Sequence, residues 1–338
     1  MYWKKFQSQR TVALQNQLTM VTAPNRQARA HFGTYGKAMA IAVCMACLTV
    51  LTGWGQERTS TQQVASRFLR TERTVRIYLP PSYWREEHRR YPVLYLQDGQ
   101  NVFSSAGTNI AFGWGSWELD KTADELCRAG KMQDIILAAV DNSPARYAEY
   151  CGAVHAASAN GNTVFENYAA FLIQELKPRI DAQYRTRPEP ASTGTMGSSM
   201  GGICSMVLAW EHPEVFGLAA SLSGAFQVET NFLNNLLRPY KGKPKAIRFY
   251  LDSGIVDFMG GDDGRKQTEA VAGELRRIGW GKALTHYVDA KPLTLSELEK
   301  TGLRRDKWAE AQTSQHNEFY WRRRAWRALT FLFPPPAN

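Results

Sequence analysis

The amino-acid sequence predicts an α/β fold with a mostly parallel central sheet and helices on both faces. Three observations support this prediction. Short apolar runs alternate with segments of helical spacing all along residues 63–333. Several of the apolar runs are nearly continuous, which is typical of strands buried on both sides of a sheet. No stretch between them resembles a long linker, so we expect one domain over residues 56–338.

The predicted elements follow one another in a regular order. We expect strands over residues 73–80, 91–99, 135–141, 191–197, 218–224, 247–254 and 284–290. Helical spacing predicts helices over residues 117–130, 164–184, 200–213, 268–278 and 318–333. Gly130 and Pro213 close two of these helices, because neither residue continues a helix well. Residues 56–63 are polar and are expected to be a link.

The charge of the chain argues against nucleic acid as a partner. The formal net charge is +10, but residues 1–56 hold six basic residues and no Asp or Glu. Removing those six leaves about +4, spread widely over the rest of the chain rather than gathered in stripes. The densest basic run, residues 321–329, is expected to be a solvated helix face.

An uncharged apolar run covers residues 38–55 and directly follows Lys37. A basic flank, an apolar run and small residues near its end are typical of a secretory signal cleaved near Gln56. The segment before the run is unusually long, so an uncleaved anchor is the alternative. We therefore expect residues 1–55 to be a signal peptide or an N-terminal membrane anchor. The protein is expected to be secreted or periplasmic, with residues 38–55 as the membrane tether if the segment is retained.

The cysteines indicate neither a metal site nor a disulfide framework. Cys44 and Cys47 lie inside the apolar run, with no second pair or His nearby, and are read as hydrophobic filler. Cys127, Cys151 and Cys204 remain and allow one disulfide at most. We expect no metal and no organic cofactor.

The pattern G-x-S-x-G occurs once and places Ser199 between Gly197 and Gly201. An apolar strand leads into the motif and a helix leads out of it, as the tight turn of a nucleophilic serine requires. A side chain at either glycine would clash where strand and helix crowd together. We therefore predict that Ser199 is a nucleophile rather than a helix cap, and that Ser198 is filler.

A serine hydroxyl attacks well only when a base removes its proton and an acid orients that base. His316 lies after the last predicted strand and just before the last helix, so its ring is predicted to reach Ser199. The acid is expected on the loop after strand 247–254, and we predict Asp257, three residues beyond Gly254. The other acidic residues of this region are Asp252, Asp262 and Asp263.

These three residues suit other roles. Asp252 is still inside the strand, and solvation or calcium ligation suits Asp262 and Asp263 as well as catalysis does. For the oxyanion hole we predict the backbone N–H groups of Met200, at the start of its helix, and Gln100, just past the Asp98-Gly99 turn.

With these residues in place, the chain resembles the "Putative esterase" family of α/β-hydrolases. This family includes feruloyl esterases, enterochelin esterases, S-formylglutathione hydrolases and mycolyltransferases. The matching segments run in the same order over residues 73–333 and include "YPVLYLQDGQNVF", "MGSSMGG" and "QHNEFYW". The resemblance implies an α/β-hydrolase fold and the roles given above for Ser199, His316, Asp257, Gln100 and Met200.

The resemblance also implies substrate contacts for Trp117, Arg146 and Tyr150, although Arg146 could equally be a structural ion-pair partner. Two segments depart from the family. Residues 291–315 form an insert that looks helical and amphipathic, and this insert could cap the cleft or merely decorate the surface. Residues 151–161 replace the usual polar loop, so the acyl and alcohol pockets cannot be copied from relatives.

The sequence therefore predicts an exported serine esterase that hydrolyses a carboxylic ester through an acyl-enzyme. The substrate is expected to be a small molecule or an ester linked to a polysaccharide. An acyltransferase of the same fold and a non-catalytic cell-surface binding protein are the alternatives.

Overall fold

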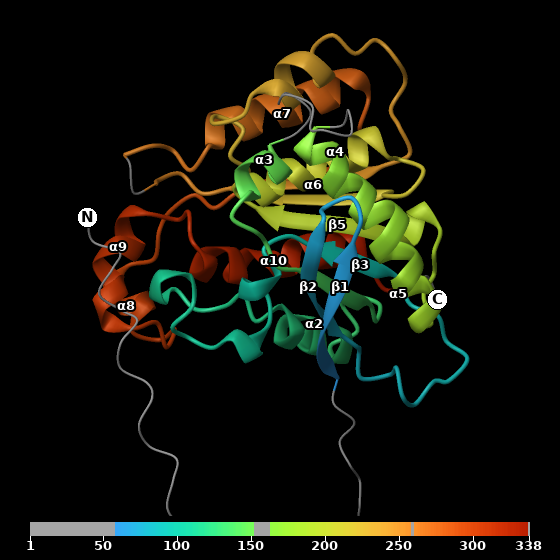
Figure 1. Cartoon of the computed structure of the whole chain (residues 1–338). Helices are drawn as coiled ribbons and strands as arrows, with labels where there is room; N and C mark the ends of the chain where they lie inside the picture. Colours follow the sequence, from blue (N-terminus) through green and yellow to red (C-terminus); the bar gives the residue numbers. More distant parts are fainter. Residues whose placement is uncertain (1–57, 152–162, 258–259, 337–338) are drawn as a thin grey trace, which may run out of the picture. The chain divides into compact units, whose positions relative to one another are not determined.

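A mixed sheet of eight strands runs through the part of the chain that the computed structural model describes, residues 58–151, 163–257 and 260–336 (Figure 1). The strand order is β1-β2-β4-β3-β5-β6-β7-β8. β1 pairs antiparallel with β2 and β2 with β4, whereas every later pair is parallel. The strands are β1 (Thr59–Ser66), β2 (Thr71–Tyr78), β3 (Val93–Leu96), β4 (Ile136–Val140), β5 (Thr193–Ser198), β6 (Leu218–Leu222), β7 (Arg248–Ser253) and β8 (Leu284–Val288).

Helices connect the parallel strands. The α-helices are α2 (Leu119–Arg128), α3 (Arg146–Tyr150), α4 (Val164–Ala170), α5 (Lys177–Gln183), α6 (Met200–Glu211), α7 (Arg265–Ile278), α8 (Leu295–Leu298), α9 (Trp308–Thr313) and α10 (Glu318–Leu332). Two π-helical segments, η4 (Phe171–Leu176) and η6 (Phe232–Leu237), complete the long elements. The shorter 3-10 turns are η1 (Gly99–Asn101), η2 (Ser104–Ala106), η3 (Ala111–Gly113), η5 (Pro190–Ser192) and η7 (Arg305–Lys307). The α/β fold predicted from the sequence is confirmed.

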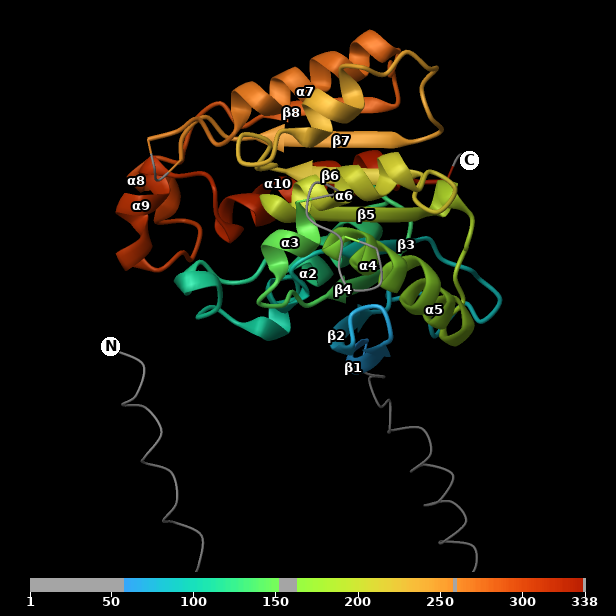
Figure 2. The same ribbon diagram turned by 45° about the horizontal axis from the view of Figure 1, so that its top comes forward.

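Both faces of the central strands are buried, which explains why β3 and β4 are apolar without a break. α6 and α10 lie on opposite faces (Figure 2). Along β3, Val93 and Tyr95 enter the cluster on the α6 side, while Leu94 and Leu96 enter the cluster on the α10 side. Because successive side chains of a strand point to opposite faces, both sets of side chains along β3 are buried and apolar.

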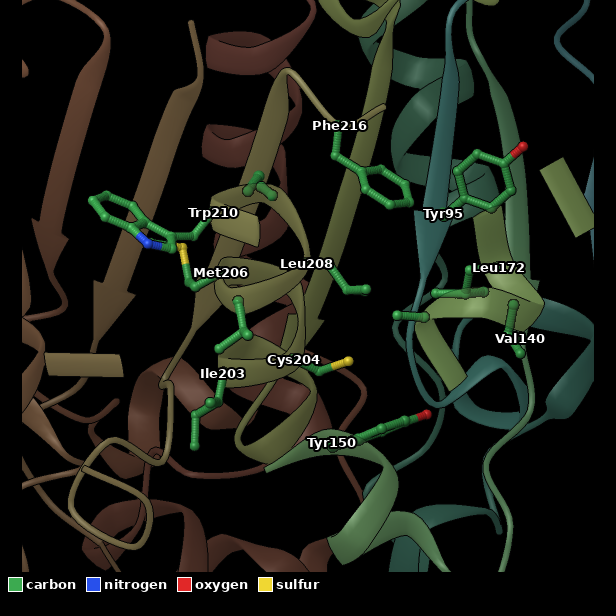
Figure 3. Close-up of a cluster of buried hydrophobic side chains, with 14 of the residues drawn as sticks. Tyr95, Val140, Tyr150, Leu172, Ile203, Cys204, Met206, Leu208, Trp210 and Phe216 are labelled. Carbon is green, nitrogen blue, oxygen red and sulfur yellow. The ribbon is translucent and has the colours of Figure 1, made fainter. Parts of the chain in front are cut away.

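The larger of these clusters packs α6 against the sheet (Figure 3). Cys204 and Leu208 of α6 face the strands, and the ring of Phe216 meets Tyr95 edge-on with centroids 6.1 Å apart. α6 is apolar nearly all round, because it lies between the sheet and further chain on its outer side. This tight packing holds the first turn of α6, where the motif serine lies.

β1, α3 and η6 are among the elements that the sequence prediction did not contain. β1 covers most of the segment expected to be a polar link, because an edge strand is held by backbone pairing to β2 and several of its side chains are exposed. The segment of α3 was given no element of its own in the sequence prediction. One turn of helix is too short for its periodicity to be recognised.

The basic run on α10 is not the uniformly solvated face that its charge predicts. Arg323 is exposed and Arg322 is half-buried, but Arg324 is only 2% exposed. A buried guanidinium requires acidic partners, and these partners lie beside the site described below.

The expected signal peptide or anchor at residues 1–55 lies outside the described residues and stays a prediction. Among the helices that the structure describes, none is both long enough and apolar enough to cross a membrane. Within the same ranges, the side chains of Cys127, Cys151 and Cys204 are free thiols, and no group of His, Cys, Asp and Glu has the arrangement of a metal site.

Candidate active site

Ser199 lies at the junction of β5 and α6, in a backbone conformation that is rare for a residue with a side chain. Its φ is 53° and its ψ is −124°, and such strain persists only where the surrounding structure enforces it. A Cβ atom at Gly197 would lie 2.5 Å from the carbonyl carbon of Gly201. The two glycines of the motif are therefore needed for the close approach of strand and helix, as the sequence predicted.

The structure brings His316 to Ser199 across 117 positions of sequence. Nε2 of His316 lies 2.9 Å from Oγ of Ser199, and Nδ1 lies 2.7 Å from Oδ1 of Asp263. His316 comes from the loop just before α10, and Asp263 comes from the loop between β7 and α7. Hydroxyl, imidazole and carboxylate thus form one continuous hydrogen-bonded chain, in the order serine, acid, histidine along the sequence.

The carboxylate beside His316 is Asp263 and not Asp257, so the sequence prediction of the acid is corrected here. Asp257 closes a turn instead, in which its backbone N–H donates to Gly261 and its carbonyl accepts from Gly260. Asp263 lies at the end of the loop, two residues before α7 begins. The prediction of Asp257 was wrong because it relied on sequence distance from the strand, which does not show which aspartate reaches the imidazole of His316.

Asp263 is held from its second oxygen as well. Oδ2 accepts a hydrogen bond from Oγ of Ser223 at 2.6 Å and another from the backbone N–H of Gly254. Complete burial acts to raise the pKa of Asp263, but the hydrogen bond and charge of His316, the charge of Arg324 and the hydrogen bond from Ser223 outweigh it. The net result is a lowered pKa, so the carboxylate stays ionised beside the ring.

Arg324 of α10 is the buried cation behind this site. Its Nε lies 3.2 Å from Oδ1 of Asp252, and its terminal nitrogens lie 3.8 Å from Asp263 and 3.8 Å from Asp289. It also donates to Oγ of Ser223 at 2.5 Å. The sequence offered no sign of this role, because an arginine in a basic helical run has the same local pattern whether it is solvated or buried.

The oxyanion hole predicted from the sequence uses the backbone N–H groups of Met200 and Gln100. Met200 opens α6 and Gln100 belongs to η1, so both N–H groups lie in first turns, where no helical partner exists. Among the described residues, neither N–H donates a hydrogen bond to another protein group. The side chain of Gln100 is fixed by accepting from the backbone N–H of Asn142 at 3.1 Å.

The three predicted substrate contacts have different outcomes. Arg146 borders the cavity at Ser199, but its guanidinium is engaged by both oxygens of Asp98, at 2.6 and 2.8 Å. Trp117 lines the same cavity and is largely buried against Trp321, with ring centroids 6.0 Å apart. Tyr150 does not reach it, and this prediction is corrected. Its side chain is fully buried, and its hydroxyl accepts from the backbone N–H of Asp98 at 3.2 Å (Figure 3).

The cavity in front of Ser199 has a volume of about 680 Å³ and an aromatic lining. Besides Trp117 and Trp321, its walls include Trp114 and the 94% exposed Phe112. Phe112 has a φ of 57°, an unusual conformation for a bulky residue, which presents its ring at the rim. The sequence did not single out these residues, because they come from a segment without a recognisable motif.

Glu318 is one of three acidic residues that line this cavity among the described residues, with Asp98 and Glu310. Its Oε1 accepts from the side-chain amide of Asn101 at 3.1 Å. Burial, aided by the charge of Asp98, raises the pKa of Glu318 to about 7. The site therefore contains one carboxyl group that is held ionised and another that is close to half-protonated at neutral pH.

The insert at residues 291–315 packs onto the start of α10. Leu298, Leu303 and Ala311 form an apolar cluster with Trp114 and the first turn of α10. The hydroxyl of Tyr320 donates to the carbonyl of Ala311 at 2.7 Å. Glu310 of the insert borders the cavity at Ser199. The insert is helical, as predicted, and it supplies a wall of the site rather than a remote decoration.

A comparison with protein families agrees with this geometry. A family model described as "Putative esterase" matches residues 66–329. The chain belongs to this esterase family. The resemblance found in the sequence is confirmed, and the protein is a hydrolase of the esterase type by family membership.

Relatives with related sequences lie in bacteria. The uncharacterized protein YbbA of Bacillus subtilis (strain 168) is 26% identical over 199 residues, which cover 56% of this chain and 69% of that protein. The endo-1,4-beta-xylanase/feruloyl esterase of Xylanibacter ruminicola is 27% identical over 209 residues, or 59% of this chain but only 24% of that protein.

Solved structures of esterases share the fold of this family member. A ferulic acid esterase superposes with a TM-score of 0.58 and 17% identity, covering 81% of this chain and 97% of that chain. The enterobactin esterase FES from Shigella flexneri superposes with a TM-score of 0.57 and 17% identity, covering 82% of this chain and 59% of that chain. At this level of identity the likeness concerns the fold alone.

Proposed function

We propose that the protein is a serine esterase that hydrolyses a carboxylic ester through an acyl-enzyme. The observation that carries this proposal is the chain of contacts from Ser199 through His316 to Asp263, with heavy-atom distances of 2.9 and 2.7 Å. Both distances are within the range of proton transfer along a hydrogen bond.

The geometry supports a sequence of steps. Nε2 of His316 accepts the proton of Ser199 as Oγ attacks the ester carbonyl, and Nδ1–H donates to ionised Asp263 throughout. The negative charge that develops on the carbonyl oxygen is directed to the N–H groups of Met200 and Gln100. His316 then returns its proton to the departing alcohol. Water, deprotonated by the same ring, attacks the acyl carbon. The bond to Oγ of Ser199 then breaks, the ring returns the proton to Oγ, and the acid is released.

The cavity favours an aromatic acyl or alcohol group. Phe112, Trp114, Trp117 and Trp321 give it aromatic faces, and such faces bind planar rings by offset or edge-to-face contacts. The names of related proteins point in the same direction, since they include feruloyl esterase and enterobactin esterase. We infer that the substrate is an ester of an aromatic acid, on a small molecule or on a polysaccharide.

Export is part of this proposal. The uncharged run at residues 38–55 behind Lys37 supports a protein that is secreted or periplasmic, or tethered by that run. Expression of the full chain and of residues 56–338 tests it. The full chain should reach the periplasm or medium, while the shorter chain should stay in the cytoplasm, and equal retention of both would reject export.

Covalent labelling tests the nucleophile. A fluorophosphonate probe should label the wild-type protein and fail to label Ser199→Ala. Ser198→Ala is the matched control, because Ser198 lines the same cavity and is expected to be labelled at the wild-type rate. Labelling that persists in Ser199→Ala would reject the proposal.

Hydrolysis of methyl ferulate, a catecholate ester and 4-nitrophenyl acetate then defines the substrate class. We expect the aromatic acyl esters to have the higher kcat/KM. Repeating the assay with added sugar acceptors separates hydrolysis from acyl transfer, because a transferase would give the acylated sugar instead of the free acid.

A further inference from the structure

A second cavity, about 370 Å³ in volume, lies beside the first and is lined by basic side chains. Lys300 and Arg304 reach it from the insert, and Arg322 and Arg323 reach it from α10. Glu118 is its single acidic lining residue among the described residues. The lining therefore carries four formal positive charges against one negative charge.

Among the described residues, two of these four cations lie in no salt bridge. Arg304 is paired with Asp306 at 2.9 Å, and Arg322 lies 3.4 Å from Glu118. Within the part of the chain that the structure describes, Lys300 and Arg323 form no salt bridge. Both are exposed, so both are free to reorient toward a ligand.

The basic side chains also repel one another. Burial lowers the pKa of Arg322 and the adjacent charge of Arg323 lowers it further, while Glu118 only partly opposes these effects. Like charges that are held together in a partly desolvated site are stabilised when an anion binds between them. Guanidinium groups suit oxyanions in particular, because their planar N–H forks match two oxygens at once.

The two cavities share a wall. Trp114 lines both of them. Two pairs of consecutive residues also have one member in each cavity. Trp117 lines the first cavity and Glu118 the second, and likewise Glu318 lines the first and Phe319 the second. The two cavities are therefore neighbours, and a substrate with its ester at Ser199 has to extend past Trp114 to meet the basic side chains.

We propose that the basic cavity is a subsite for an oxyanion, such as a carboxylate, carried by the molecule whose ester is cleaved at Ser199. The inference rests on the esterase function proposed above. It assigns the insert at residues 291–315 a role in selecting acidic esters, because Lys300 and Arg304 belong to that insert.

Paired substrates test the subsite. One series consists of 4-nitrophenyl half-esters of linear dicarboxylic acids, from succinate to sebacate, and the other of 4-nitrophenyl esters of the matching monocarboxylic acids. A parallel pair of series places the carboxylate on the alcohol side, as acetyl esters of ω-hydroxy acids against acetyl esters of the matching alkanols. At the length that spans the two cavities, we expect the wild type to prefer the acidic ester, and added NaCl to weaken that preference.

The double variant Lys300→Gln with Arg323→Gln should lower kcat/KM for the acidic ester by about tenfold to a hundredfold, mainly through KM. Its kcat/KM for the neutral ester should stay within about twofold of wild type. The matched control is Lys131→Gln with Lys243→Gln. These two exposed lysines precede β4 and β7 and so lie near the amino ends of parallel strands, whereas Ser199 lies at the carboxyl end of β5. This control should leave both substrates unchanged.

The outcomes separate the two proposals. If the wild type cleaves both kinds of ester equally at every length and the double variant changes neither, the subsite is rejected while the esterase function stands. If Ser199 is not labelled and no ester is cleaved, the esterase function is rejected. In that case, calorimetric titration of sebacate still tests the cavity, since binding should be lost in the double variant and kept in the control. Equal binding of sebacate by the double variant and the control would overturn the anion subsite.

Discussion

At the residue scale, two carboxyl groups near Ser199 lie in opposite electrostatic settings. The hydrogen bond and charge of His316, the charge of Arg324 and the hydrogen bond from Ser223 hold the pKa of Asp263 below the usual range. Glu318 has one amide donor and is largely desolvated, so its pKa rises to about 7. One of these acids lines the cavity and the other is buried behind His316, and the two keep different protonation states at neutral pH.

Asp263→Asn is expected to reduce kcat by about 10³-fold to 10⁴-fold, because an amide no longer stabilises the imidazolium or selects the right tautomer. Asp257→Asn is the matched control, since Asp257 lies in the same loop but contributes to a turn. Its kcat should stay within about threefold of wild type. Steady-state kinetics with a 4-nitrophenyl ester measure kcat of both variants. A larger loss of kcat in Asp257→Asn than in Asp263→Asn would identify Asp257 as the acid.

Glu318→Gln is expected to change how stability depends on pH. The folded-state pKa of about 7 lies above the ordinary value of 4.5. The wild type therefore loses stability as pH rises from about 4.5 to about 7, because the folded state must ionise a desolvated group. The variant lacks this loss, so its free energy of unfolding relative to wild type should increase by about 1–3 kcal/mol between pH 4.5 and pH 8. Urea unfolding at pH 4.5 and pH 8 measures this free energy for both proteins. A difference between variant and wild type that is the same at both pH values would contradict the explanation.

At the element scale, the junction of β5 and α6 determines where the nucleophile lies. The strand ends, one residue turns with a positive φ, and the helix begins immediately, so Oγ of Ser199 projects at the carboxyl edge of the sheet. The geometry requires strand and helix to touch where Gly197 meets Gly201. A local clash there would move the serine away from His316.

Gly197→Ala is expected to lower the free energy of unfolding by about 3 kcal/mol, because its Cβ would lie 2.5 Å from backbone atoms of Gly201. Gly273→Ala is the control, since Gly273 lies inside α7 with no atom within 4 Å of an added Cβ. This change should raise stability by about 0.5–1 kcal/mol, because alanine restricts the unfolded chain. Chemical denaturation measures the free energy of unfolding of the two variants. Equal changes in the two variants would show that the backbone near Gly197 shifts enough to avoid the clash.

At the scale of the whole molecule, Arg324 ties α10 to the carboxyl ends of three strands. Its guanidinium contacts Ser223, which follows β6, and Asp252, which lies near the end of β7. It also lies 3.8 Å from Asp289, which follows β8. Asp263 joins the same group. Burial acts to raise the pKa of Asp252 to about 6 even with this cation nearby. The cluster therefore depends on Arg324 to balance several buried carboxylates.

Arg324→Leu is expected to lower the free energy of unfolding by about 3–5 kcal/mol at pH 8, because it leaves buried carboxylates without their cation. The loss should be smaller at pH 5, where the buried acids can take up protons. Arg323→Leu, on the exposed side of the same helix, should change stability by less than about 0.5 kcal/mol. Thermal and urea unfolding at the two pH values measure these effects, and a loss that does not depend on pH would argue against the charge balance.

The sequence by itself determined the fold class and the position of the serine. Continuous apolar runs indicate strands covered on both faces, and G-x-S-x-G places a tight turn between a strand and a helix, so both patterns are local. His316 was predicted from its place before the last helix, and the structure brings it to Ser199.

The tertiary structure alone decided the identity of the acid, the burial of Arg324 and Tyr150, and the lining of both cavities. Each of these depends on how a loop returns or on which distant segments meet, and composition and spacing carry no information about such paths. Asp257 and Asp263 belong to one acidic, glycine-rich loop, and only the folded structure decides that Asp263 reaches the imidazole.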